Sequence, residues 1–149
     1  MKKVAIVYES RHHANTQKIV DAISSYHSAE LIDASKQPHF DLSEYDLIGF
    51  ASGIDFGKFY DSVERFLEEN LPKNKQIFFL YTCAKPSSRF TSSIRVAAQE
   101  KNAIILGEYG CKGYNTYGPW KLIGGINKNH PTPVELKEAV SFYKSLLHL

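Results

Sequence analysis

Apolar positions along this chain recur with two different periodicities, one typical of buried strands and one typical of amphipathic helices. Each change of periodicity marks the boundary of a predicted element. Val4–Tyr8 (VAIVY) is apolar at successive positions, which is typical of a strand that is covered on both faces. From Asn15 onward, apolar side chains recur at helical spacing at Ile19, Val20 and Ile23. This first part of the chain therefore predicts a buried strand followed by an amphipathic helix.

The same patterns extend over the rest of the chain. Further strands are predicted at Ala29–Asp33, Asp46–Ser52, Gln76–Cys83 and Ala103–Tyr109. Further helices are predicted at Phe59–Asn70, Thr91–Lys101 and Val134–Leu147, the last opened by Pro133. Apolar strands that alternate with amphipathic helices favour an α/β fold, a parallel sheet with helices on both faces. The connection Cys111–Pro133 is unusually long, and such connections are often binding loops.

Composition limits the class of protein. The chain has 149 residues, 43% of them hydrophobic, and no internal repeat, which predicts a single domain over residues 1–149. The formal net charge of +2 is too small to imply nucleic acid or an anionic membrane as an obligatory partner. Two cysteines do not form a disulfide framework, and the apolar run after Lys3 is shorter than that of a signal peptide. We therefore expect a cytoplasmic protein, monomeric by default.

Three loops are candidates for the chemistry. Ligands of open parallel sheets bind beyond the carboxyl ends of the strands, where the strand order reverses. The loops that leave such ends are the first loop (Glu9–Asn15), the second loop (Gly53–Lys58) and the third loop (Ala84–Phe90). The first loop opens onto a helix N-terminus, where free N–H groups and the helix dipole favour a phosphate. The alternative is that Asn15 or Thr16 is simply an N-cap and that the two histidines are solvated.

The second and third loops suggest space for a planar group. Phe56 lies between two glycines, so its ring either stacks on a ligand or packs inward. The small residue Ala84 leaves room at a strand end. Cys83 is more typical of a small buried hydrophobe than of a nucleophile, although a redox pair with Cys111 is conceivable. Adjacent histidines without a suitably spaced carboxylate or thiolate do not form a metal site.

Three stretches together resemble one known family. YESRHHANTQKI is similar to the phosphate-loop signature of the flavodoxins, SGIDFGKF resembles their second flavin loop, and TCAK falls at the third. The resemblance covers essentially the whole chain. It implies a flavodoxin-like three-layer α/β/α sandwich with a five-stranded parallel sheet of order 2-1-3-4-5, for which flavodoxin is the type example. It also implies non-covalent FMN.

The resemblance assigns the cofactor to three sets of residues. The phosphate would lie among Ser10, Arg11, His12, His13, Ala14, Asn15 and Thr16. The ring would lie between Ser52, Gly53, Ile54, Asp55, Phe56 and Gly57 on one side and Thr82, Cys83, Ala84 and Lys85 on the other. The family carries electrons between redox proteins by the chemistry of the flavin itself, so no catalytic side chain is required.

The chain departs from the family pattern in four respects. Ala14 replaces a usual glycine, so its methyl group crowds the phosphate or shifts the backbone. Asp55 stands where an aromatic residue is common, and its charge near the ring would lower the flavin potential. The third loop lacks the aromatic residue that covers the flavin ring in the family. Tyr114, Tyr117 or Trp120 could take that role, and ordinary packing is an equal alternative for these residues. The net charge of +2 also differs from the acidic surface of typical carriers.

Two alternatives remain open beside an electron carrier. One is a flavin-dependent reductase of quinones or other small acceptors, with Gly113–Pro133 as a pocket wall. The other is a flavin-less module that uses the same fold to bind a partner. A phosphoacceptor receiver domain needs an acidic cluster and an aspartate at the ends of the first and third strands. Glu9 and Ser52 do not provide them.

Overall fold

The computed structural model describes residues 2–116 and 118–148. Its strands are β1 (Val4–Glu9), β2 (Glu30–Asp33), β3 (Leu47–Asp55), β4 (Lys58–Phe59), β5 (Gln76–Cys83) and β6 (Ile104–Lys112). Its α-helices are α1 (Asn15–Tyr26), α2 (Asp61–Asn70), α3 (Ser92–Glu100) and α4 (Pro133–Leu147). Short 3₁₀ segments are η1 (His12–Ala14), η2 (Ser88–Thr91) and η3 (Gly118–Ile123). Every strand and α-helix predicted from the sequence is present.

The sheet has the order β2-β1-β3-β5-β6, and each of these neighbours is parallel. The predicted α/β architecture and the order of its five parallel strands are therefore confirmed. The two-residue β4, which the sequence did not predict, pairs antiparallel with the end of β3 and makes the sheet six-stranded. The order reverses between β1 and β3, because the chain leaves β1 for β2 on one side and returns to β3 on the other.

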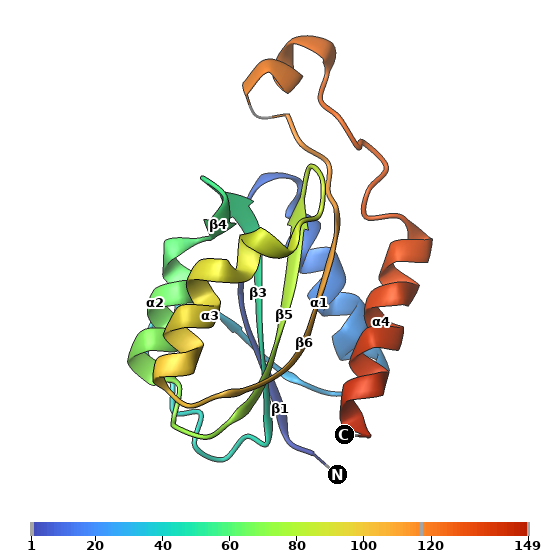
Figure 1. Ribbon diagram of the computed structural model, residues 1–149. Coiled ribbons are helices and arrows are strands. Elements are labelled where there is room, and N and C mark those ends of the chain that lie inside the picture. The colour runs from blue at the N-terminus through green and yellow to red at the C-terminus, as the bar shows by residue number, and fades with distance from the viewer. Residues whose placement is uncertain (1, 117, 149) are drawn as a thin grey trace.

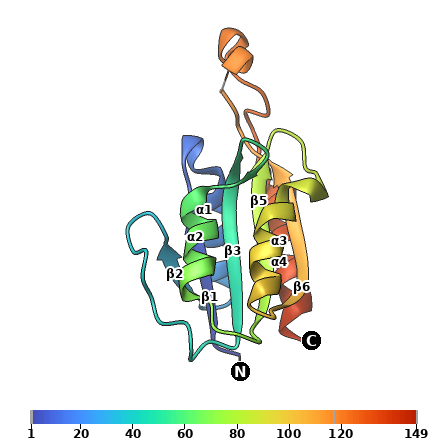
Figure 2. The same cartoon turned by 60° about the vertical axis from the view of Figure 1, so that its left-hand side comes forward.

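Helices cover both faces of the sheet. Figure 1 shows α1 and α4 on one face and α2 and α3 on the other, and Figure 2 shows the same layers after rotation. Side chains of β3 alternate between these layers. Ile48 and Phe50 join the core with α2 and α3, whereas Leu47 and Ala51 join the core with α1 and α4. This alternation explains why apolar residues occupy both parities of the strand.

The hairpin between β3 and α2 differs from the prediction. β3 continues to Asp55, and a two-residue turn then reverses the chain into β4. Phe56 and Gly57 have positive φ values of 52° and 77°, as the turn of a twisted hairpin requires. Because Phe59 pairs with Ile54 in this hairpin, α2 begins at Asp61 and not at Phe59.

A long loop, Gly113–Thr132, separates β6 from α4. It projects beyond the carboxyl ends of the strands in both views (Figures 1 and 2). An isolated bridge between Asn115 and Ile126 closes its stem, and η3 lies near its tip. No helix in the described part of the chain is long and apolar enough to cross a membrane.

Candidate functional site

The first loop forms a backbone cradle at the start of α1. His13 and Ala14 have left-handed conformations with φ of 63° and 55°, and Asn15 is right-handed helical. Successive left- and right-handed residues turn their N–H groups toward a common point, which is a known anion-binding arrangement. The first-turn N–H groups of α1 add to it. The side chain of His12 lies outside the part of the chain that the structure describes.

The hydroxyls of the first loop are used to hold its ends. Ser10 Oγ accepts a hydrogen bond from the N–H of Gln17, at 3.1 Å. The expectation that Asn15 or Thr16 is an N-cap is wrong, since Ala14 occupies that position without a side-chain bond. Thr16 is buried instead, with its Oγ1 3.0 Å from Thr82 Oγ1. The start of α1 is therefore tied directly to the end of β5.

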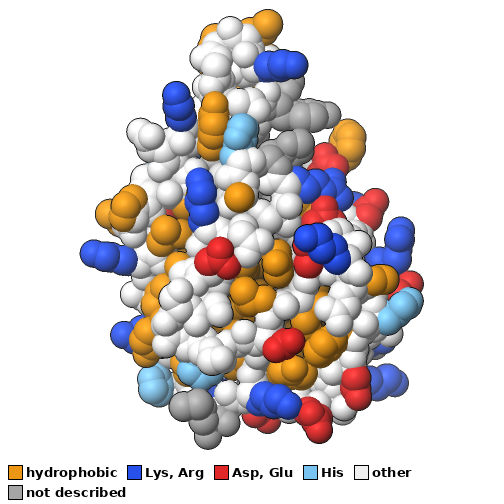
Figure 3. All heavy atoms as spheres, turned by 180° about the vertical axis from the view of Figure 1, so that it is seen from behind, with side chains coloured by type: hydrophobic (Ala, Val, Ile, Leu, Met, Phe, Trp, Pro, Cys, Tyr) orange, Lys and Arg blue, Asp and Glu red, His pale blue; other side chains and the backbone are white. Residues whose placement is uncertain are grey.

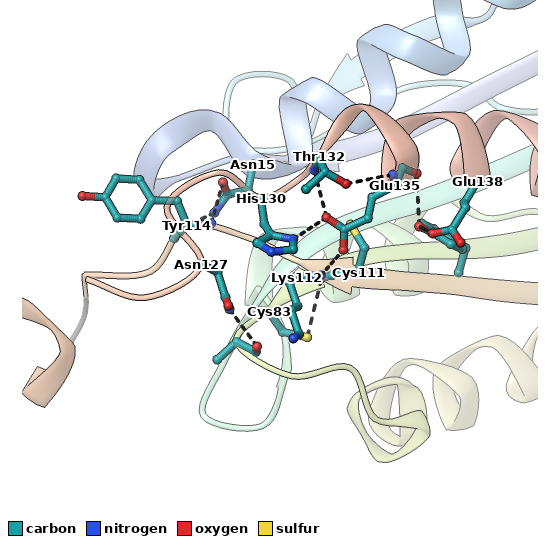
Figure 4. Close-up of polar contacts among 12 residues, drawn as sticks. Asn15, Cys83, Cys111, Lys112, Tyr114, Asn127, His130, Thr132, Glu135 and Glu138 are labelled. Atoms are coloured by element: carbon teal, nitrogen blue, oxygen red, sulfur yellow. Dashed lines mark hydrogen bonds and ion pairs between the residues drawn. The ribbon is translucent and has the colours of Figure 1, made fainter. Parts of the chain in front are cut away.

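The first loop also holds the base of the long loop. Asn15 Nδ2 donates to the Tyr114 carbonyl at 2.8 Å, and Asn15 Oδ1 accepts from the Tyr114 N–H at 3.1 Å (Figure 4). The His13 ring stacks on the Tyr114 ring with centroids 3.9 Å apart. His13 Nε2 also lies 3.0 Å from Thr116 Oγ1. Two predicted phosphate-loop residues, Asn15 and His13, thus contact a segment that is distant from them along the chain.

Arg11 links the first loop to the hairpin. Its Nε donates to the buried carboxylate of Glu9, and its Nη1 lies 3.8 Å from Asp55 Oδ2. The guanidinium also stacks over the Tyr60 ring, 3.9 Å from its centroid. The hydrogen bond with Glu9 raises the pKa of Arg11 despite partial burial. The charge of Asp55 consequently has a cation beside it, and the role of Arg11 in phosphate binding stays a prediction.

Two predicted residues at the end of β3 serve the packing of Tyr60. Ser52 is fully buried, and its Oγ accepts the Tyr60 N–H at 2.9 Å. A Cβ on Gly53 would lie 2.2 Å from the Tyr60 hydroxyl oxygen, so this position admits only glycine while Tyr60 stays in place. The backbone at this strand end is thereby fixed in position.

The tip of the second loop is solvent-exposed. Phe56 is 91% exposed beside Gly57, so the expectation that Phe56 packs inward is wrong. Ile54 is partly buried against the core and anchors the hairpin. The hairpin therefore presents an aromatic side chain on a paired stem at the carboxyl end of β3.

The third loop provides small and polar groups beside β6. Cys83 Sγ lies 3.8 Å from the Cys111 carbonyl oxygen, and both thiols are free. Burial raises the pKa of each thiol to about 12, which keeps both protonated and does not favour a redox pair. The Ala84 carbonyl accepts a hydrogen bond from Asn127 Nδ2 at 2.9 Å, and Lys85 is exposed. The long loop therefore contacts the third loop as well as the first.

Glu135 joins the two ends of the long loop (Figure 4). Its Oε1 lies 2.5 Å from His130 Nδ1 and accepts the Thr132 N–H at 2.8 Å. Its Oε2 accepts the Lys112 N–H at 3.3 Å. Burial acts to raise the pKa of Glu135, but the hydrogen bonds from Thr132, His130 and Lys112 lower it below its ordinary value. A single ionised carboxylate thus holds the stem of the loop closed.

Sequence reasoning missed four residues that shape this end of the molecule: Glu9, Tyr60, Asn127 and Glu135. Only Glu135 left a local signal. Thr132 and Glu135 have the spacing of a capping box, and the structure contains that box at the start of α4. Tyr60 and Asn127 act through contacts between distant segments. Glu9 contacts both Arg11, two residues away, and the distant Ser62.

Comparison with known proteins agrees with the fold. Residues 5–120 match the model of the flavodoxin domain family. An uncharacterised protein of Methanocaldococcus jannaschii is 43% identical over 147 residues, which cover 97% of this chain and 98% of that protein. Oxidised Flavodoxin 2 from Bacillus cereus superposes with a TM-score of 0.66 at 16% identity and covers 98% of each chain.

A flavoprotein from Lactobacillus acidophilus in complex with FMN superposes with a TM-score of 0.57. Its identity is 18%, over 75% of this chain and 93% of that chain. At these identities the solved structures establish the shared fold, while the family model covers more than half of the sequence. The chain belongs to the flavodoxin domain family.

Proposed function

We propose that this protein binds FMN non-covalently and carries electrons between redox partners. The observation that carries the proposal is the backbone cradle at Ala14 and Asn15. It lies after β1, at the point where the strand order reverses, and this is where open parallel sheets bind their ligands. The family assignment and the FMN complex of the Lactobacillus acidophilus protein support the same ligand.

The residues present fit a phosphate group. The N–H groups around Ala14 and Asn15 converge at the positive end of the α1 dipole. Ser10 holds the first turn of α1 through Gln17, and Thr16 fixes that turn against Thr82. The cradle is therefore held by side chains that are already satisfied, which leaves the backbone donors to receive the phosphate.

The same edge of the sheet fits a planar ring. Phe56 offers an exposed aromatic face at the tip of the hairpin, and Ala84 is a small residue at the end of β5. When bound, the flavin supplies the electron-transfer chemistry. The protein orients it and sets the local charge, because Arg11 lies between the carboxylates of Glu9 and Asp55.

The long loop favours a second candidate function, a self-contained flavin-dependent reductase. It projects over the same edge of the sheet and contacts the first loop through Asn15 and the third loop through Asn127. A wall of this kind could enclose a quinone or another small acceptor beside the ring.

Steady-state oxidation of NADH or NADPH, with FMN-loaded protein and a soluble quinone, distinguishes the two functions. A carrier gives no turnover until a separate flavodoxin reductase is added. Turnover without that reductase would contradict electron carriage and support the reductase. An FMN-loaded sample is identified beforehand by its visible absorption, so a protein that fails to bind flavin is recognised separately.

A further inference from the structure

Positive charge is concentrated in the third loop and the long loop, which contact each other through Ala84 and Asn127. Residues 84–90 and 112–132 contain five of the eighteen Lys and Arg residues and none of the sixteen Asp and Glu residues. The remaining thirteen basic and sixteen acidic residues give the rest of the chain a formal charge of −3. The five cations are exposed and are Lys85, Arg89, Lys112, Lys121 and Lys128. The net charge of +2 therefore conceals a strong asymmetry.

The outermost part of the long loop is apolar. Leu122 is 88% exposed, Ile123 is 70% exposed and Trp120 is 39% exposed, with Lys121 among them. Figure 3 shows hydrophobic side chains at the far end of the projection, with a basic side chain next to them. Single exposed apolar residues are ordinary, but three within four positions at the end of a projection form a patch. We call residues 120–123 the apolar tip.

The structure holds the apolar tip away from the body of the protein. Below the tip, Asn115 and Ile126 form a bridge, and the Tyr114 hydroxyl donates to the Gly124 carbonyl at 3.1 Å. Directly after the tip, the Gly125 N–H donates to the Trp120 carbonyl at 2.7 Å. These bonds give the loop its own structure, so the apolar side chains do not fold back onto the sheet.

We infer that the apolar tip and the surrounding cations form a docking surface for an anionic phospholipid bilayer. Trp120, Leu122 and Ile123 enter the interfacial region, and Lys121 and Lys128 contact lipid phosphates. Interfacial binding combines buried apolar side chains with basic residues, and tryptophan is enriched at that depth. The inference rests on the proposed function in one respect: the flavin edge then faces the membrane, where a lipid-soluble redox partner resides.

An acidic protein partner fits the surface less well. Stable protein interfaces place an apolar centre in a flush patch that is surrounded by a polar rim. Here η3, which carries the apolar residues, lies at the far end of the projection, and the third loop lies closer to the sheet (Figures 1 and 2). A deformable bilayer accepts such a projection without a matching cavity.

Vesicle flotation of the full chain tests the inference. Vesicles of phosphatidylcholine alone and vesicles mixed in equal parts with phosphatidylglycerol are compared, with and without added FMN. We expect binding to the anionic vesicles, weakened by salt, and little binding to phosphatidylcholine. The double variant Leu122→Ser/Ile123→Ser should bind at least about tenfold more weakly. Lys121→Gln/Lys128→Gln should also lose about tenfold.

Matched variants separate the docking surface from general effects. Val96→Ser/Ile104→Ser removes two exposed apolar residues elsewhere, and Lys73→Gln/Lys144→Gln removes two exposed cations near the opposite end. Both should bind like the wild type. Absence of wild-type binding to anionic vesicles, or equal losses in the matched variants, would overturn the inference. Retention on an immobilised acidic ferredoxin without vesicle binding would reassign the surface to an acidic protein. Since bound FMN is read from its absorption, a failure of flavin binding is scored independently.

Discussion

The side-chain amide of Asn15 forms hydrogen bonds with both the N–H and the carbonyl of Tyr114. Asn15 belongs to the predicted phosphate loop, and Tyr114 is the second residue of the long loop, 99 positions further along the chain. The first loop and the long loop are consequently one structural unit. A substitution in either loop should therefore alter the stability of the other.

Asn15→Ala should lower the free energy of unfolding by about 1–2 kcal/mol, because two partly buried hydrogen bonds are lost. It should also accelerate hydrogen exchange of the Tyr114 amide, which loses one of its acceptors. Urea denaturation and exchange detected by NMR measure the two effects. Gln17→Ala, which removes an exposed bond to Asp21 in the same helix, serves as the control. An equal effect of both substitutions would show that Asn15 does not join the loops.

Ala14→Gly should stabilise the protein. Ala14 has a φ of 55°, a left-handed conformation that costs an alanine more than a glycine. After the entropy of glycine in the unfolded chain is deducted, we expect a gain of roughly 0.5–1 kcal/mol by urea denaturation. Ala22→Gly, in the regular part of α1, should destabilise the protein by about 1 kcal/mol. The same sign for both substitutions would contradict the left-handed assignment.

Local patterns predicted most of the fold. The pattern predicts the bounds of the buried strand Gln76–Cys83 to the residue, because an apolar run between turn signals has few other structures to adopt. The bounds of the other predicted strands differ from the prediction by one to three residues at one end or both. The hairpin at Phe56 and Gly57 was missed because its turn residues also suit a ligand loop. The sequence shows glycines but not the pairing of Ile54 with Phe59.

The sequence predicts where the candidate site lies but not which side chains contact one another within it. The positions of its three loops follow from parallel topology, since each leaves the carboxyl end of a strand. Asp55 could not be predicted as a partner of Arg11, because the two residues meet only after β1 and β3 have paired. The hydrogen bonds between Asn15 and Tyr114 likewise could not be predicted from the periodicity of apolar residues. Tyr117, one predicted cover for the ring, lies outside the described residues.

Glu135→Gln should destabilise the stem of the long loop in a pH-dependent manner. The pKa of Glu135 is lowered in the folded protein, so its stabilising effect is complete above the ordinary value of 4.5 and disappears as pH falls through the lower folded value. We expect the variant to lose about 1 kcal/mol near neutral pH and nothing in strong acid. Thermal denaturation over a pH series measures the difference. Glu68→Gln, at an exposed position of α2, should show no such trend.

Both cysteines should be unreactive in the folded protein. A pKa of about 12 for Cys83 and Cys111 leaves roughly a thousandth of the ordinary thiolate at neutral pH. Alkylation with iodoacetamide, followed by mass spectrometry, should label neither residue until urea unfolds the chain. The half-buried Cys83 is the sensitive probe. Rapid labelling of Cys83 in the native protein would restore a redox role for this thiol.

The most direct test of FMN binding is a parallel titration of the flavin-free protein with FMN and with riboflavin, followed by flavin fluorescence. The two ligands share the ring and differ in the phosphate. If the cradle at Ala14 and Asn15 holds the phosphate, one equivalent of FMN should bind. Riboflavin should then bind with an affinity that is lower by a factor of about one hundred or more. Equal binding of the two, or no uptake of FMN, would contradict the account.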